Sequence, residues 1–594
     1  MSMNCSPGRC EWETPVKSVE KWSTFVQWNS LLASGLLLAA CVPQPLSLRS
    51  HAAEPAALSG VVPPRRPADF KPYRYPFATE ELRARFSEAQ MRRAAAAVKE
   101  MTAVNEKGPW KPIWESLDKH RAPEWFSDAK LGVFINWGLH SVPAWATPSK
   151  KARYPDAYGT WMYTDDRVRA HHAQFWGPDF QFDDFFPLFT ADRYDPEAMV
   201  QFLHDCGVRY IVPMCKHHDG VAWWDSAWTK RNFAQLGPKR DLLMPLAAAA
   251  RKRDMKLGLY LTWREYATVA IGPKDELQAM LFDLDKTPTV PFSEANRRRM
   301  QGQVPVRDIV GQYLLPLGKE MVDRFDPDYL WMDGEWRDST ERLRSRELAA
   351  YFYNKNAGRK EACVNDRYGK NTRIHHGDVF CSEYHTTKSL SHAWEECRGI
   401  GHAFAHEYEE EQDEQLLGTA ADLIYLFVDV ISQNGNLNLV VGPDASGQFP
   451  KPLADRLKAL GRWINVNAEA VYGTRALEPY EEGSVRFTGS KDGRFAYAIL
   501  KQWPGKRLVL KGIRAAEGTT LKLLGVGKPL AWEHDGKGLS IRIPDSLQNE
   551  KNRPCQHAWV VKITRQSKSG GKAAAGRVLY HDGQKQDRQA AATG

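Results

Sequence analysis

The chain has 594 residues, of which 43% are hydrophobic and 11% aromatic, so it can build more than one folded domain and is not an intrinsically disordered protein. Its net charge of +9 comes from 81 basic and 72 acidic residues spread along the chain. The sequence has no long basic run and no nucleic-acid-binding motif, so nucleic acid is not an expected partner. The nine cysteines lack CxxC or metal-ligand spacing, which leaves no recognisable zinc site or disulfide framework.

Residues 1–53 have the pattern of an export signal and its flank. The apolar segment 31–41 is too short to cross a bilayer as a helix and follows a basic stretch. Two processing sites compete. The segment Leu-Ala-Ala-Cys resembles a bacterial lipoprotein signal in which Cys41 is lipidated, whereas cleavage after Ala52 or Ala53 releases a soluble protein. Both sites predict a location outside the cytoplasm, either periplasmic, secreted or lipid-anchored, and a lipid on Cys41 is the expected membrane contact.

The next region, 54–110, is predicted to be a Pro/Arg-rich linker followed by a helix at 80–101. From residue 125, apolar runs of strand length alternate with amphipathic runs of helix length. The predicted strands are 131–135, 208–215, 256–263, 329–333 and 362–366, and the predicted helices are 196–206, 241–253, 309–325 and 343–354. This alternation indicates βα units around a parallel sheet. Because no Gly-rich phosphate turn is present and polar clusters follow successive strands, we expect a (β/α)8-like TIM barrel over 111–470.

The pattern changes after residue 472 to short alternating strands separated by Gly, Pro and Asp turns. The predicted strands are 484–488, 494–501, 507–513, 519–524, 539–543 and 559–563. We therefore predict a C-terminal antiparallel β-sandwich over 471–565. Residues 566–594 are too poor in large apolar side chains to fold and are expected to be a disordered tail.

Polar side chains follow the predicted barrel strands, and Asp333 ends the fourth. A charge would not be tolerated inside a strand buried on both faces, but the C-terminal strand ends of a barrel are where side chains meet substrate. We interpret Asp333 as a carboxylate nucleophile at a sugar-binding floor; taken alone, the stretch also suits a capping or loop Asp. His217 and His218, after the second strand, suit hydrogen bonds to sugar hydroxyls. A structural role is the alternative, and a metal site is disfavoured because no third ligand has a familiar spacing.

Eight motifs occur in a fixed order between about residues 125 and 475. They are WFSDAKLGVFINWGLHSVPAW (125–145), KHHDGVAWWDS (216–226), GPKRDLL (237–243), LWMDGEW (330–336), VNDRYG (364–369), SEYHT (382–386), DVISQNGNLNLVVGPDASG (429–447) and YGTR (472–475). In this order and spacing the chain resembles glycoside hydrolase family 29, the retaining α-L-fucosidases. The resemblance implies a terminal α-L-fucosyl residue of an oligosaccharide or glycoconjugate as substrate. It implies no metal or organic cofactor, and the oligomeric state stays open.

The resemblance also implies roles for individual residues. Asp333 would be the nucleophile and Glu383 the general acid/base of a double displacement, with Glu395 as the alternative for the second role. The substrate-binding residues it implies are Asn136, Trp161, His217, His218, Trp331, Arg367 and Phe404, the last as an apolar wall for the C6 methyl group.

Two positions depart from the family pattern. Asn136 stands where the family usually has His, and Thr160 stands where it has Glu before Trp161. Both changes weaken hydrogen bonding to the O3/O4 edge of the sugar, so we expect looser discrimination at C3 and C4. A retaining glycosidase for L-galactose or a C4 variant is therefore the alternative. A binding protein that has lost catalysis is a further alternative, which the presence of both Asp333 and Glu383 disfavours.

Overall fold

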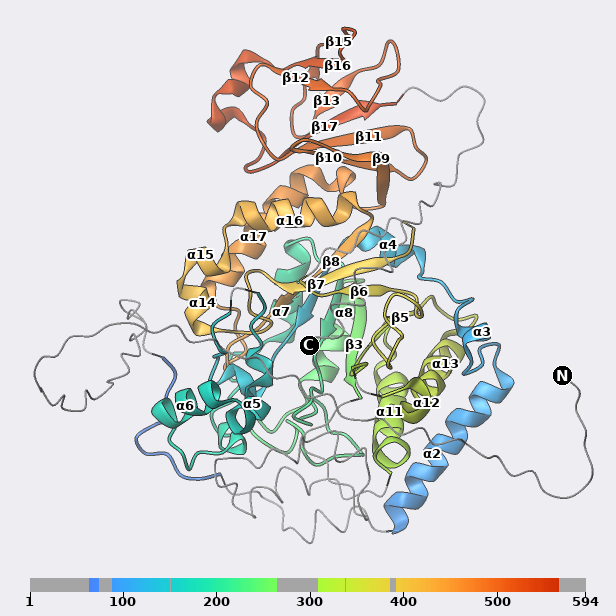
Figure 1. Ribbon diagram of the computed structural model, residues 1–594, viewed down its shortest axis with the longest axis vertical. Helices are drawn as coiled ribbons and strands as arrows, with labels where there is room; N and C mark the ends of the chain where they lie inside the picture. Colours follow the sequence, from blue (N-terminus) through green and yellow to red (C-terminus); the bar gives the residue numbers. More distant parts are fainter. Residues whose placement is uncertain are drawn as a thin grey trace, which may run out of the picture. The chain divides into compact units, whose positions relative to one another are not determined.

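The computed structural model describes residues 63–73, 88–149, 151–263, 308–336, 338–384 and 391–565 (Figure 1). All of them belong to one compact unit that begins at Gly60. The predicted export signal with its candidate lipid site at Cys41, and the predicted tail 566–594, lie outside the described residues. The predicted helix at 80–101 corresponds to α2 (Glu88–Lys107), and the first residues of that prediction also lie outside the described part.

Eight parallel strands form the central sheet, in the order β5-β4-β3-β2-β1-β8-β7-β6. They are β1 (Leu131–Ile135), β2 (Tyr210–Pro213), β3 (Lys256–Thr262), β4 (Tyr329–Asp333), β5 (Cys363–Val364), β6 (Phe380–Ser382), β7 (Trp394–Gly399) and β8 (Gly435–Val441). The first and last strands pair in register, with Leu131 opposite Leu437. A parallel bridge between Asn365 and Val379 joins the two edges next to β5 and β6. The sheet thus curls into the predicted (β/α)8 barrel.

Both faces of the barrel strands are buried, as the apolar runs predict. In β4, Leu330 and Met332 belong to the core between sheet and helices, whereas Tyr329 and Trp331 belong to the core inside the barrel. Side chains alternate between the two faces of a strand, so the next inward position after Trp331 is Asp333. The end of β4 therefore delivers Asp333 to the barrel interior.

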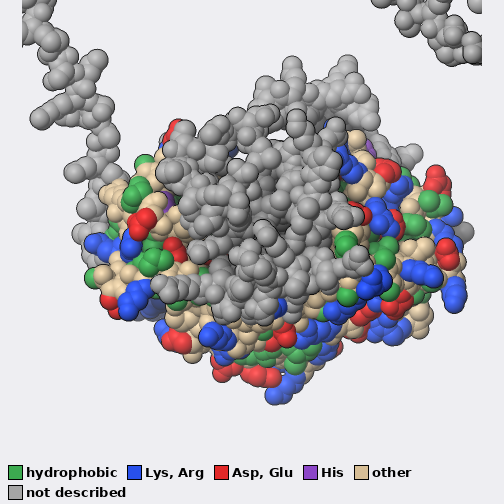
Figure 2. Space-filling model, turned by 90° about the horizontal axis from the view of Figure 1, so that it is seen from below, with side chains coloured by type: hydrophobic (Ala, Val, Ile, Leu, Met, Phe, Trp, Pro, Cys, Tyr) green, Lys and Arg blue, Asp and Glu red, His purple; other side chains and the backbone are tan. Residues whose placement is uncertain are grey.

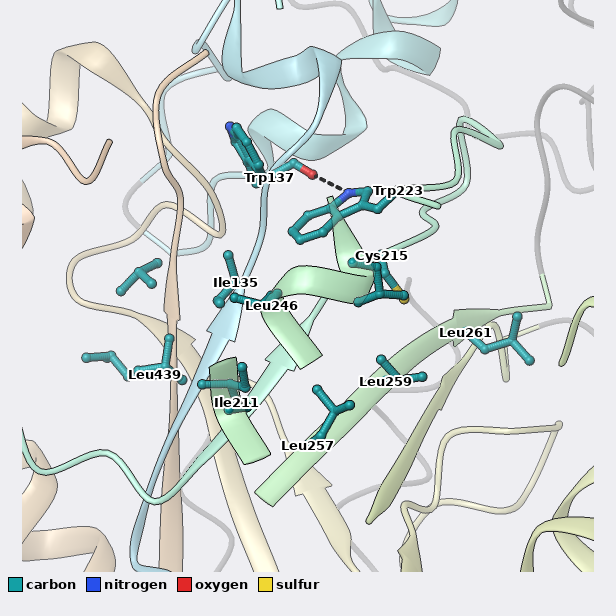
Figure 3. Packing of buried hydrophobic residues seen from close by; sticks show 14 of the residues in the cluster. Ile135, Trp137, Ile211, Cys215, Trp223, Leu246, Leu257, Leu259, Leu261 and Leu439 are labelled. Atoms are coloured by element: carbon teal, nitrogen blue, oxygen red, sulfur yellow. Dashed lines mark hydrogen bonds between the residues drawn. The ribbon is translucent and has the colours of Figure 1, made fainter. Parts of the chain in front are cut away.

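The outer layer is closed by helices that follow the strands. They include α7 (Pro196–Asp205), α8 (Leu243–Lys252), α11 (Leu315–Phe325), α12 (Thr340–Leu343), α13 (Ser345–Asn356), α16 (Ala420–Ser432) and α17 (Lys451–Asn467). Figure 3 shows Leu246 of α8 near apolar residues of β1, β2, β3 and β8. In the same view the indole N–H of Trp223 donates to the Trp137 carbonyl at 3.2 Å. The loops after β1 and β2 are thereby tied together above the sheet.

The structure refines two predicted helices. The prediction 309–325 contains a π-helical turn, η4 (Val310–Leu314), before α11. The prediction 343–354 is divided into α12 and α13 because Arg344 takes a left-handed conformation with φ 52°. Its side chain then pairs with Glu347 at 2.7 Å, which holds the break in place. Apolar periodicity alone does not reveal either interruption.

Beyond the barrel, antiparallel strands form two sheets, as predicted. The six-stranded sheet has the order β14-β13-β17-β11-β10-β9 and the three-stranded sheet the order β12-β16-β15. Their strands are β9 (Thr474–Glu482), β10 (Val485–Ser490), β11 (Phe495–Leu500), β12 (Arg507–Leu510), β13 (Leu521–Leu523), β14 (Pro529–Leu530), β15 (Trp532–His534), β16 (Leu539–Arg542) and β17 (Trp559–Thr564). These sheets enclose a core of their own. Helices α16 and α17 lie between them and the barrel (Figure 1), and the Trp463 indole donates to the Ala558 carbonyl at 2.9 Å.

Segment Glu414–Ser432 is long and apolar enough to span a membrane by composition. It contains α15 (Glu414–Leu417) and α16, separated at Gly418, and the apolar residues of α16 are part of the main core. We therefore assign it as a core helix of the fold.

In the described ranges six cysteines are present, and all six are unpaired. The coloured surface in Figure 2 mixes basic and acidic side chains, which fits the dispersed charge of the sequence.

Candidate active site

A pocket of about 200 Å³ opens at the C-terminal ends of the barrel strands. Its walls come from the strand ends and from the long segment between β1 and α7. The lining residues are Tyr154, Asp156, Ala157, Thr160, Trp161, Met214, His217, His218, Tyr260, Trp331, Asp333, Trp336, Arg367, Glu383 and Phe404. A pocket of this volume has room for a sugar ring.

Asp333 is held in its ionised form. It is 6% exposed, accepts the Tyr260 hydroxyl at 2.7 Å, and lies 3.1 Å from Nε of Arg367. Nε2 of His218 lies 3.9 Å from Oδ2 of Asp333, the oxygen that accepts the Tyr260 hydroxyl. Burial by itself raises the pKa of this carboxyl, but the Arg367 charge, His218 and the Tyr260 hydrogen bond outweigh it and lower the pKa below its usual range. The carboxylate is therefore available as a nucleophile.

Glu383 follows β6 directly and faces the same pocket. The Tyr154 hydroxyl donates to its Oε1 at 2.7 Å, and Nη1 of Arg367 donates to its Oε2 at 2.6 Å. Its side chain is 16% exposed, so it is more accessible than that of Asp333. Each oxygen accepts one of these two hydrogen bonds, and the side chain lies at the wall of the pocket.

Arg367 links the two acids. Its guanidinium contacts Asp333 and Glu383 through different nitrogens and lies over the Trp331 ring at 5.2 Å. Burial opposes the charge, but the surrounding carboxylates Glu335, Asp333 and Glu383 raise its pKa well above the usual value. A planar fork with several donors can contact two carboxylates at once, which an ammonium group does less well.

The two histidines lie side by side, with ring centroids 4.1 Å apart. Nδ1 of His218 is 2.7 Å from the Thr262 hydroxyl, which orients its Nε2 toward the carboxylate of β4. Nε2 of His217 is 3.7 Å from Asp156. Both histidines line the pocket. Among the residues described, no group of three or more His, Cys, Asp or Glu side chains is arranged to hold a metal ion.

Glu395, the alternative acid/base, lies away from the pocket. It is fully buried inside the barrel, where its carboxyl group accepts hydrogen bonds from the Trp331 indole at 2.6 Å and the Tyr210 hydroxyl at 2.9 Å. Tyr329 adds a third donor at 3.1 Å. Burial raises its pKa, and these hydrogen bonds oppose the rise. Glu395 therefore holds the pocket floor through Trp331 and has no access to a substrate.

Asn136 also differs from the expectation that it contacts the sugar. It is completely buried, and its side-chain amide donates to the Phe404 carbonyl. The residue supports the wall that Phe404 presents to the pocket. The remaining predicted residues line the pocket, namely Asp333, Glu383, Trp161, His217, His218, Trp331, Arg367 and Phe404.

Family models match almost the whole described chain. An α-L-fucosidase model matches residues 97–469, and an α-L-fucosidase C-terminal domain model matches residues 480–564. The chain belongs to the α-L-fucosidase family. The first match spans the barrel with every residue of the pocket, and the second spans the antiparallel sheets.

Individual members of the α-L-fucosidase family match over most of their length. The tissue α-L-fucosidase of Bos taurus is 30% identical over 464 residues, covering 76% of this chain and 91% of the relative. The tissue α-L-fucosidase of Homo sapiens gives the same identity and the same coverage. The crystal structure of Thermotoga maritima α-fucosidase in complex with a mechanism-based inhibitor is 31% identical with a TM-score of 0.62, covering 77% of this chain and 100% of that one.

Sequence reasoning missed several residues of this fucosidase pocket. Tyr154 and Asp156 come from η2 and its approach, in an irregular segment that carries no periodic signal. Tyr260 had a usable signal, since it lies two residues before Thr262 on β3 and therefore shares its inward face. Trp336 ends the motif that contains Asp333, and it is 47% exposed at the pocket.

Proposed function

We infer that this protein is an exo-acting retaining α-L-fucosidase, which hydrolyses terminal α-L-fucosyl residues by double displacement. The observation that carries the inference is the shared guanidinium of Arg367, which contacts both Asp333 and Glu383 at the wall of a pocket for one sugar ring. Retaining glycosidases use two carboxyl groups closer together than inverting enzymes do, because no water must fit between the nucleophile and the sugar.

In the first step the Asp333 carboxylate attacks the anomeric carbon. The bond from that carbon to the leaving oxygen breaks, and Glu383 in its protonated form gives its proton to that oxygen. The product is a glycosyl ester on Asp333. The lowered pKa of Asp333 supports this role, because only the ionised form is nucleophilic.

In the second step a water molecule attacks the anomeric carbon while Glu383 takes its proton. The ester bond breaks, and Asp333 leaves as a carboxylate that Arg367 and the Tyr260 hydroxyl are positioned to stabilise. The sugar is released with the configuration that it had in the substrate. Each acid returns to its starting protonation state.

The other pocket residues are assigned to substrate binding. His217 and His218 present ring nitrogens that can donate to or accept from hydroxyl groups, and Trp161 and Trp331 present aromatic faces. Phe404 supplies the apolar surface expected for a methyl group. These assignments rest on the lining of the pocket together with the family resemblance.

The direct test is a panel of nitrophenyl α-L-glycosides with purified protein. We expect the highest kcat/KM for the α-L-fucoside, with the first-formed sugar in the α-configuration by NMR. A higher kcat/KM for the α-L-galactoside or for a C4 epimer would show that the protein is a glycosidase for that related L-sugar and not a fucosidase. If the folded protein hydrolyses none of the glycosides, a carbohydrate-binding protein without catalysis is the remaining alternative.

A second test addresses the nucleophile. Asp333→Gly removes the carboxylate at a strand end, so turnover should fall by several orders of magnitude while the fold persists. Added azide should restore part of the rate by attacking in place of the carboxylate, giving a β-L-glycosyl azide. Near-normal activity of the folded variant would remove Asp333 from the mechanism.

We also propose that the protein acts outside the cytoplasm. The support is the apolar segment 31–41 with its adjoining candidate processing sites. Cell fractionation of the producing cells decides the location, and Cys41→Ser distinguishes a lipid-anchored from a soluble product. Retention of the full-length chain in the cytoplasm would contradict the proposal.

A further inference from the structure

Asp156 is a buried carboxyl group of the pocket that the double displacement does not use. It lies in the short turn η2 (Pro155–Ala157), just before α5 (Tyr158–Thr164), and is 8% exposed. Its Oδ1 is buried and has no hydrogen-bond donor among the described residues. An acceptor buried in this way is costly, and most such groups in proteins have a partner. Because Asp156 lines the pocket, a bound ligand can supply that partner.

The groups that face Asp156 do not neutralise it. Nε2 of His217 lies 3.7 Å from Oδ2 of Asp156, and Arg367, a cation of the same pocket, is engaged with Asp333 and Glu383. Burial, together with the charges of Glu383 and Asp333, raises the pKa of Asp156 to about 7, although hydrogen bonding by the Asn136 side chain and by its own backbone opposes the rise. Donors from a ligand would favour the ionised form.

The same wall carries Thr160, four residues later. Asp156 lies in η2 and Thr160 in α5, and both side chains line the pocket. The pocket-lining residues of this wall are Tyr154, Asp156, Ala157, Thr160 and Trp161, and Asp156 is the one carboxyl group among them. The wall therefore has a carboxyl group although residue 160 is neutral.

We propose that Asp156 is a specificity-determining residue that accepts hydrogen bonds from ring hydroxyl groups of the sugar in this pocket. The inference rests on the proposed glycosidase function and adds a recognition residue to it. A carboxylate has two oxygens, so it can accept from two neighbouring hydroxyls, and an ionised acceptor makes the stronger bond. A sugar that lacks or misplaces one of these hydroxyls leaves the carboxylate without its donor and is rejected. Thr160 alone predicts loose discrimination between sugars that differ at C3 or C4, and Asp156 restores this discrimination.

The test compares Asp156→Asn and Asp156→Ala with the parent on aryl α-L-fucosides that lack the hydroxyl at C2, C3 or C4 in turn. For the complete sugar we expect kcat/KM to fall about 10-fold in the Asn variant and about 100-fold in the Ala variant, the range for losing a charged hydrogen bond. For at least one of the deoxy sugars, the same substitutions should lower kcat/KM only slightly, because the hydroxyl group that Asp156 binds is already missing. An equal loss on all four substrates, or no loss on any, overturns the proposal.

Two further measurements separate this inference from the proposed function. L-Fucose binding by calorimetry should weaken in the Asp156 variants, and this readout does not need turnover. If the parent binds fucose in a way that depends on Asp156 but hydrolyses no glycoside, the proposed function is wrong and the inference about Asp156 stands. If the parent hydrolyses the fucoside and the Asp156 variants behave like the parent, only the inference is wrong. Absence of fucose binding in the parent overturns both.

The matched control is Asp179→Asn, which changes an exposed aspartate paired with Arg66 outside the pocket and should leave kcat/KM unchanged. Thermal unfolding checks that each variant is folded. The double variant Asp156→Asn/Thr160→Glu returns a carboxylate to the same wall, so it should recover part of the lost discrimination. A double variant no better than Asp156→Asn, together with unchanged binding, counts against an electrostatic role.

Discussion

Arg367 contacts both acids of the pocket but lowers the pKa of Asp333 in particular. Asp333 is enclosed by Arg367, Tyr260 and His218, and these contacts favour its anion. Glu383 shares the guanidinium but sits at the more open wall. Lysine at position 367 would place a single charge without the planar fork, so it could not hold both acids in this geometry. The two carboxyl groups thus share one cation but differ in their burial and in their other contacts.

The acid/base role proposed for Glu383 predicts that the effect of its removal depends on the leaving group. A protonated acid matters most when the leaving oxygen is strongly basic, because that oxygen cannot depart unaided. Glu383→Ala should therefore reduce kcat for natural fucosyl glycans far more than for an activated nitrophenyl fucoside. The measurement is kcat for both substrates in parent and variant.

Glu395→Gln provides the contrast to Glu383→Ala. It alters a carboxyl group inside the barrel that accepts from Trp331, Tyr210 and Tyr329, so we expect a lower Tm and similar losses for both kinds of substrate. Leaving-group selectivity in the Glu395 variant, and not in the Glu383 variant, would reverse the two assignments.

Glu335 predicts a dependence of stability on pH. It is 6% exposed, and its carboxyl lies 3.5 Å from Arg367 and 3.6 Å from Arg373. Burial raises its pKa to about 7; the arginines oppose this and the Asp333 charge adds to it. An unfolded Glu has a pKa of about 4.3, so between about pH 4 and 7 the folded protein keeps a proton that the unfolded chain has released. This contribution to stability is complete at low pH and is lost as pH rises toward 7.

Glu335→Gln removes that loss. We measure the free energy of unfolding of variant and parent by urea titration at pH 5 and pH 7.5. The difference, variant minus parent, should be about 1–3 kcal/mol larger at pH 7.5 than at pH 5. Glu550→Gln, which changes a glutamate 84% exposed, should follow the parent at both pH values. Parallel pH profiles for the parent and the Glu335 variant would contradict the raised pKa.

At the level of single elements, β1 depends on a glycine. A Cβ on Gly132 would lie 2.1 Å from the Tyr210 ring, and that ring carries the hydroxyl that binds Glu395. Gly132→Ala should therefore displace Tyr210 and destabilise the protein by about 1–3 kcal/mol, the usual cost of overpacking a core. Gly527→Ala adds the same methyl group where no atom lies within 4 Å, so its unfolding midpoint should stay near that of the parent. Equal midpoints for the two variants would show that the barrel interior absorbs the methyl group.

Elements differ in how well their sequence predicts them. Strands β1 and β4 match the predicted limits because their apolar runs are continuous and end at turn residues. Strand β7 carries Glu395, Glu396 and Arg398, so no apolar run marks it, and its burial depends on hydrogen-bond partners from distant strands. Strand β6 has three residues, too few for any periodicity.

The residues of the pocket also differ in how well the sequence predicts them. Residues at strand ends, such as Asp333 and His217, follow from the barrel pattern and the family motifs. Asp156 and Tyr154 do not, because the segment between β1 and α7 reaches the pocket through irregular turns and short helices whose course depends on packing. The sequence leaves Glu395 open as an alternative to Glu383, because a carboxyl group inside a barrel and one at its mouth look alike in sequence, and the donors that distinguish them come from β2 and β4.

In the whole molecule, Asp429 of α16 connects the barrel to the antiparallel sheets. It pairs with Arg486 of β10 at 2.7 Å and with Lys501 at 2.8 Å. Both partners are mostly buried, so the contacts are weakly screened by solvent. Asp429→Asn should lower the free energy of unfolding by about 1–2 kcal/mol, measured by urea titration, more than an exposed pair contributes.

The comparison for Asp429 is Asp455→Asn, which breaks an exposed pair with Lys451 on α17. That change should stay within about 0.5 kcal/mol of the parent. If the two variants lose the same stability, the junction between barrel and sheets contributes no more than the open surface does.

The pairing of β1 with β8 imposes an order of events on the chain. Strand β1, the first barrel strand in the sequence, can pair with β8 only after β8, the last barrel strand, has been synthesised. Until then one edge of β1 is free, with unpaired backbone groups beside the apolar side chains of its neighbours, a template for association between chains. Fragments that stop short of residue 435 are therefore expected to aggregate rather than to fold, and refolding of the full chain is expected to be slow because its final contact is among its most distant in sequence.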